Sequence, residues 1–174
     1  GSVKGSLHVG GALIPGGDGI FVAKLDPDGE LVWAHTYGSS AGMQADHGLG
    51  VAVTEAGGVL VSGAYKGALD FGAGALPNAP GAFVAALDAA GSALWSTALP
   101  GTSAFVAAGP NDDVFVATSG DGGAMTAMRL HAGGAKAWSH DYAPGSFTAV
   151  ARDADGVLLT GSTTTADFGG GKLP

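Results

Sequence analysis

The chain has no cysteine, little positive charge and no long apolar run, and each absence excludes a class of function. Without cysteine there are no disulfides, thiolate metal sites or thiol nucleophiles. Seven Lys and Arg stand against fifteen Asp and Glu, for a net charge of −8, and the few basic residues do not cluster, so the chain is not expected to bind nucleic acid. No apolar stretch approaches the roughly 20 residues that a membrane-spanning helix needs, and no membrane span is predicted in this chain.

Strong helix-forming stretches are also scarce, whereas glycine is abundant. The 174 residues include 33 Gly, are 46% hydrophobic and only 13% charged, a composition that favours many short strands joined by tight turns. The glycines follow no three-residue period, so a collagen-like helix is excluded. The sequence predicts an all-β fold, and the length predicts one domain, at most two.

The chain repeats itself. The segment that begins at Leu7 matches the segment that begins at Leu69 without a gap, so that Trp33 corresponds to Trp95 at a spacing of 62 residues. A third copy carries Trp138, 43 residues after Trp95. Since a residue that recurs once per unit usually packs between units, we expect these tryptophans to lie between neighbouring sheets.

Each unit is predicted to contain four short strands. Two-strand segments recur from Gly48, Ser103 and Ser146, with Gly, Asn and Asp at their turns, and a second strand pair turns at residues 27–29 in the first unit. These residues tolerate the positive φ of tight hairpins. Four-stranded repeats of about 40 to 50 residues are typical of β-propeller blades. A β-sandwich is the alternative, but it requires no internal repeat.

The predicted units divide the chain into an N-terminal half-blade at 1–37, complete repeats at 48–99 and 103–142, and a C-terminal half-blade at 146–174. Together they amount to three blades, whereas propellers usually close with about four to eight. The chain is therefore expected to belong to a longer propeller or to associate with a copy of itself through its blade edges. Two copies would give six blades.

The string DGIFVAKLDPDGELVWAHTYG, followed by AVTEAGGVLVSGAYKGALDFGAGAL, resembles the bacterial SBBP-type β-propeller repeat. The segment LDAAGSALW is similar to the repeats of quinoprotein-type propellers. The third copy departs from the pattern, with Thr126 at the phenylalanine position and His131 at the aspartate position. The resemblance implies a bacterial protein that is extracellular, periplasmic or on the cell surface, with a binding or scaffolding role and no implied activity.

Candidate functional residues are few. The segment from Ser39 to His47 lengthens the first interval, and an inserted loop is a common place for a binding surface; its polar residues Gln44, Asp46 and His47 are the predicted binding residues. Alternating carboxylates at residues 26–30 could begin a calcium loop, but a hairpin turn is favoured. No catalytic residue, metal site or cofactor is predicted.

The sequence thus favours a non-enzymatic propeller module that binds a protein or a glycan. Two alternatives stay open. One is a quinone-dependent or hydrolytic propeller enzyme whose active-site residues lie in blades outside this chain. The other is a partial propeller that assembles as an oligomer.

Overall fold

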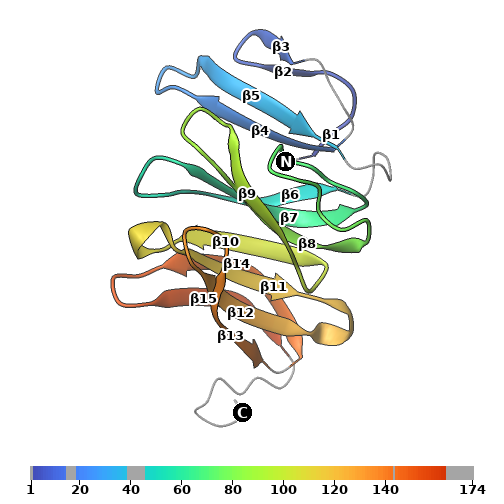
Figure 1. Cartoon of the computed structure of the whole chain (residues 1–174), viewed down its shortest axis with the longest axis vertical. Coiled ribbons are helices and arrows are strands. Elements are labelled where there is room, and N and C mark those ends of the chain that lie inside the picture. The colour runs from blue at the N-terminus through green and yellow to red at the C-terminus, as the bar shows by residue number, and fades with distance from the viewer. Residues whose placement is uncertain (1, 15–18, 39–45, 143, 164–174) are drawn as a thin grey trace.

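The computed structural model describes residues 2–14, 19–38, 46–142 and 144–163, and these residues form an all-β protein, as predicted. The helical content of this part of the chain is two three-residue 3-10 turns, at Pro110–Asp112 and Asp121–Gly123. The first three sheets follow one another along the long axis of the molecule, from the N-terminal sheet at the top of Figure 1 to the sheet of β10 to β13 at the bottom, where β14 and β15 overlap that sheet in this view. In the described residues they do not close into a ring.

The described residues form five sheets, one of them a small hairpin, and the other four are numbered here in chain order. The first sheet has the order β1-β4-β5, and its strands are β1 (Ser2–Val3), β4 (Gly19–Leu25) and β5 (Leu31–Tyr37). A separate hairpin pairs β2 (Leu7–Val9) with β3 (Ala12–Ile14). The second sheet consists of β6 (His47–Val53), β7 (Val59–Lys66), β8 (Pro80–Leu87) and β9 (Ala93–Leu99).

The third sheet consists of β10 (Ser103–Ala108), β11 (Val114–Ser119), β12 (Met125–Leu130) and β13 (Lys136–Tyr142). The fourth sheet pairs β14 (Gly145–Arg152) with β15 (Val157–Thr163). All strand pairings are antiparallel, and all of them join consecutive strands except the pairing of β1 with β4. This up-and-down order follows from the short turns that join the strands.

The 62-residue repeat is reproduced in the strand register. In the first sheet Ser2 pairs with Ile20, and in the second sheet Ala64, 62 residues later, pairs with Ala82. The β2–β3 hairpin likewise has its counterpart in the connection between β7 and β8, where Asp70 bridges to Ala75. The first sheet therefore contains the equivalents of the end of β7, all of β8 and all of β9.

The described cores lie between the sheets. One cluster joins the first two sheets and includes Ile20, Val61 and Phe83. A second cluster joins the second sheet to the third and includes Leu60 and Val106. The central strands of the second sheet, β7 and β8, are covered on both faces and therefore read as almost continuous apolar runs.

Glycine is required where the inner strand bulges. The register of β6 shifts between Gly48 and Gly50, and there a Cβ on Gly63 would lie 1.8 Å from the carbonyl oxygen of His47. The fourth sheet has the same bulge, and a Cβ on Gly161 would lie 2.1 Å from the carbonyl oxygen of Ser146. A β-bulge brings two residues opposite one, so the partner backbone approaches too closely for any side chain.

Candidate functional site

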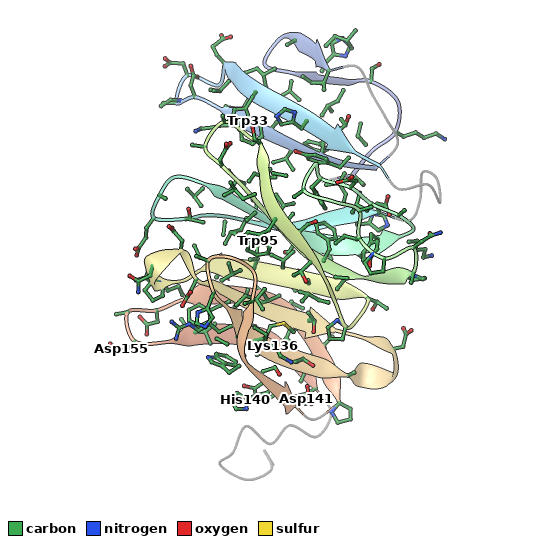
Figure 2. All side chains as sticks on the ribbon, in the orientation of Figure 1. Trp33, Trp95, Lys136, His140, Asp141 and Asp155 are labelled. Carbon is green, nitrogen blue, oxygen red and sulfur yellow. The ribbon has the colours of Figure 1, made fainter. Side chains whose placement is uncertain are left out.

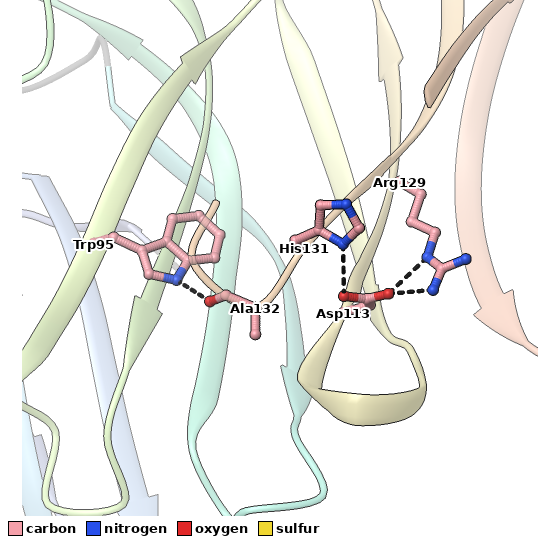
Figure 3. Close-up of polar contacts among 5 residues, drawn as sticks. All are labelled: Trp95, Asp113, Arg129, His131 and Ala132. Atoms are coloured by element: carbon pink, nitrogen blue, oxygen red, sulfur yellow. Dashed lines mark hydrogen bonds and ion pairs between the residues drawn. The ribbon is translucent and has the colours of Figure 1, made fainter. Parts of the chain in front are cut away.

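The tryptophans of the repeat fasten each sheet to the next one. Trp33 of β5 donates its indole N–H to the carbonyl of Ala89, in the β8–β9 turn, at 3.1 Å. Trp95 of β9 makes the equivalent bond to the carbonyl of Ala132, in the β12–β13 turn, at 2.6 Å (Figure 3). Both rings are half-buried between sheets, which agrees with the position expected from the repeat.

The turns that receive these indoles share one backbone geometry. In the second sheet Asp88 N–H donates to Ser92 and Gly91 N–H donates to Asp88. The third sheet has the same two bonds although His131 replaces the aspartate. The Nδ1 atom of His131 instead lies 3.4 Å from Oδ1 of Asp113. The other carboxylate oxygen of Asp113, Oδ2, accepts from the Arg129 guanidinium (Figure 3).

The predicted binding residues do not form one cluster of exposed groups. Gln44 lies outside the described residues. Asp46 is 2% exposed, and its carboxylate accepts a hydrogen bond of 3.0 Å from the backbone N–H of Lys66. His47 is exposed and begins β6. The contact of Asp46 has a structural effect, since it ties the start of β6 to the end of β7.

A larger recess lies between the second and third sheets. This groove has a volume of about 800 Å³, compared with about 190 and 260 Å³ for the two grooves between the first and second sheets. It is bordered by β9, β12 and β13. Its apolar lining includes Leu99, Met125 and Met128, and its polar lining includes Lys136 and Asp141. Figure 2 shows the last two side chains on the outer strand of the third sheet.

Two differences between the repeats account for this groove. Between the first and second sheets, Phe83 fills the equivalent space, and its ring centroid lies 5.1 Å from that of Phe71 in the inserted β7–β8 hairpin. The third sheet has the smaller Thr126 at the phenylalanine position, and a short connection at 120–124 in place of that hairpin. The space is therefore left open. The sequence shows Thr126 at the phenylalanine position of the repeat, but no sequence pattern marks either difference as a binding site.

The chemistry of the groove is mixed. Its floor contains the buried side chains of Met128 and Leu130, and a flexible thioether adapts to varied apolar ligands. On the rim, Thr126 donates its hydroxyl to a carboxylate oxygen of Asp141 at 2.7 Å. Lys136 adds a positive charge from the same strand. An apolar floor with a few polar groups at the rim is typical of a binding surface.

The equivalent region between the first and second sheets is aromatic and closed. The ring of Tyr37 lies 4.7 Å from that of Phe71, and Tyr65 packs edge-on against Phe83. Burial raises the pKa of both tyrosines above the ordinary value of about 10. Both hydroxyls therefore stay protonated at neutral pH.

No metal centre is formed by the residues that the structure describes, where no three His, Asp or Glu side chains come together. The carboxylate of Asp26, a calcium candidate in the sequence, instead accepts backbone N–H groups of Asp28 and Glu30 at 3.0 and 2.9 Å. It caps the β4–β5 hairpin turn. Within the described ranges, no helix is long and apolar enough to cross a membrane.

No family model matches the chain, and no curated protein matches it. Among solved structures, it is similar to the crystal structure of a protein of unknown function from Bacteroides caccae. The match has a TM-score of 0.54 and 18% sequence identity, and it covers 87% of this chain and 51% of that protein. The chain thus corresponds to about half the length of its structural neighbour. At this identity the likeness shows a shared fold alone.

Proposed function

We propose that the chain is part of a β-propeller and acts as a non-enzymatic binding module, with the groove between its second and third blades as the ligand site. The observation that carries the ligand site is the recess of about 800 Å³ at a position that the neighbouring blade pair fills with Phe83 and the inserted hairpin. The resemblance to SBBP-type repeats supports a place outside the bacterial cytoplasm.

Contacts near one end of the sheets support the radial arrangement that a propeller needs. The first strands β6, β10 and β14 contact one another in sequence. Their turns converge, since Ala56 N–H donates to Asp112 at 3.2 Å and Arg152 pairs with Glu55 at 2.9 Å. The last contact links the fourth sheet to the second. Sheets that meet along their first strands and spread apart at their last strands are arranged as blades around an axis.

A protein segment fits the groove better than a glycan. The strand β13 is the outer edge of the third sheet, and an edge strand offers unpaired backbone groups to an extended peptide. The floor formed by Met128 and Leu130 suits apolar side chains of such a peptide. A glycan would stack on an exposed aromatic ring. The ring of Trp138 is half-buried and packs against those of Phe115 and His140, with centroids 6.4 and 5.2 Å away.

The test is selection of binders from a random peptide display library, with a glycan array in parallel. The Thr126→Phe variant restores the residue found in the neighbouring blade and should fill the groove, so peptides selected on the unmodified chain should bind it at least about tenfold more weakly. Leu94→Ala, at an exposed position on β9, is the matched control and should leave binding unchanged. Glycans sensitive to Thr126→Phe would reverse the choice of ligand, and the absence of any ligand sensitive to it would refute the site.

A further inference from the structure

Two faces of the molecule expose apolar side chains that are buried at the equivalent positions of complete sheet pairs. Val51 pairs with Val61 as Val106 pairs with Val116, yet Val51 is 68% exposed and Val106 only 6%. At the other end of the row, Leu158 pairs with Ala151 as Leu60 pairs with Ala52. Leu158 is 59% exposed and Leu60 is 1% exposed.

These two exposed faces are the two halves of one contact. Leu60 and Val106 belong to the same core cluster, between the second and third sheets. The face of Leu158 is equivalent to the Leu60 side of this contact, and the face of Val51 is equivalent to the Val106 side. The chain therefore carries both surfaces needed for another sheet contact, at opposite ends of its row of sheets.

The tryptophan bonds show the same mismatch. Among the described residues, Trp138 has no acceptor for its indole N–H, whereas Trp33 and Trp95 each bond to a turn of the next sheet. Conversely, the hairpin turn between β4 and β5 accepts no indole hydrogen bond from the described residues. It has the backbone bonds of the other two turns, and a Cβ on Gly29 would meet no described atom within 4 Å. At the two occupied turns, a Cβ on the equivalent glycine would lie 3.0 or 3.1 Å from tryptophan ring atoms.

The strands complement each other as well. The fourth sheet has the equivalents of the first two strands of a blade, β6 and β7, and the first sheet has the equivalents of the last two, β8 and β9. The end of β15, at Ser162 and Thr163, is equivalent to Ala64 and Tyr65 of β7, and so is the short strand β1. β15 and β1 are thus alternative partners for the same edge of β4.

We propose that two copies of this chain exchange these elements, so that β15 of each copy pairs with β4 of the other in place of β1. Leu158 then packs against Val51 of the second copy, and the Trp138 indole N–H donates to the Pro27 carbonyl, the counterpart of Ala89 and Ala132. Each copy closes the row of the other, which gives six four-stranded blades. The inference rests on the propeller architecture proposed above and is independent of the groove.

The first measurement is the mass of the 174-residue chain in solution by light scattering over a range of concentrations. The expected mass is twice 16.7 kDa. A monomer at every concentration would overturn the proposal, and so would a series of larger oligomers, because two exchanges in a pair of copies leave no open edge. The groove variant Thr126→Phe should keep the dimer mass, which separates this proposal from the binding site.

A cysteine pair identifies the contact itself, since the chain has no native cysteine. Oxidised Val51→Cys/Leu158→Cys should form a covalent dimer, visible on a non-reducing gel. The control Leu94→Cys/Leu158→Cys should not, because Leu94 is 61% exposed even in a sheet with neighbours on both sides. A dimer mass without the Val51–Leu158 cross-link would overturn the exchange. Leu158→Lys changes a site that is exposed in the single copy. This variant should be folded by circular dichroism and have the mass of one copy by light scattering.

Discussion

The contact between the second and third sheets and the contact between the first and second sheets use the same repeat but differ in completeness. In the former, four strands face four, and Val106 is 6% exposed. In the latter, three strands face four, and Val51 and Val53 stay 68% and 65% exposed. The incomplete contact compensates with aromatic packing, in which Phe71 of the inserted hairpin lies between Tyr37 and Phe83. Equivalent sequence positions thus have unequal energetic weight.

The largest predicted effect concerns this aromatic packing. Phe83→Ala removes a fully buried ring and should lower the free energy of unfolding by about 3 to 5 kcal/mol. Thr126→Ala, at the equivalent position of the third sheet, should cost about 0.5 kcal/mol, because its side chain lines an open groove. Chemical denaturation of both variants measures the difference. Equal losses would show that the groove closes in solution.

The valine pair compares the two contacts directly. In the Leu158→Lys background, which should keep copies apart, Val106→Ala should cost about 2 kcal/mol of unfolding free energy since it uncovers buried apolar area. Val51→Ala in the same background should change it by less than about 0.5 kcal/mol. Denaturation midpoints at constant slope provide the measurement. A large loss at Val51 would mean that this face is covered within one copy.

The tryptophan bonds give a smaller effect. Trp95→Phe removes the donor to the Ala132 carbonyl and should lower the free energy of unfolding by about 1 kcal/mol. Trp138→Phe should leave the unfolding free energy of the monomer unchanged and lower the affinity of the dimer. Indole N–H exchange measured by NMR adds a second readout. The Trp33 and Trp95 signals should be protected at all concentrations, and the Trp138 signal only where the dimer forms.

The smallest effect is the pH dependence of the aromatic cluster. Burial raises the pKa of Tyr37 and Tyr65 in the folded chain, so the unfolded chain loses these protons first as the pH rises. The contribution of these two tyrosines to stability should therefore be constant below about pH 10, where tyrosine is protonated in both states, and decrease above it. The double variant Tyr37→Phe/Tyr65→Phe should reduce this decrease in alkaline denaturation.

Strands, turns and the tryptophan positions could be predicted from the sequence because each depends on local pattern. Alternation, turn residues and the ungapped repeat locate the hairpins, and the structure shows the repeat in the register of Ser2 with Ile20 and Ala64 with Ala82. The candidate site was harder to predict from the sequence. The burial of Asp46 depends on the position of Lys66, twenty residues further along the chain, and the groove depends on what the third sheet lacks.

The space left by a missing side chain or hairpin is hard to predict from one sequence for a physical reason. The pattern shows Thr126 at a phenylalanine position, but whether the backbone closes over the missing volume is decided by side chains of both neighbouring sheets. The structure shows that β9 and β13 do not close over it. The same limit applies to Trp138, whose sequence context resembles that of Trp33 while its surroundings differ.

The tryptophan bonds also bear on how the chain folds. Each one joins a sheet only to its immediate neighbour, so the stability is expected to approximate a sum of sheet and nearest-neighbour terms, as in linear repeat arrays. Opening should then begin at the two ends of the row, where a sheet has one neighbour, and reach the second and third sheets last. Amide hydrogen exchange would record this as a gradient of protection along the chain, and closure of the row into a ring would abolish the gradient by removing its ends.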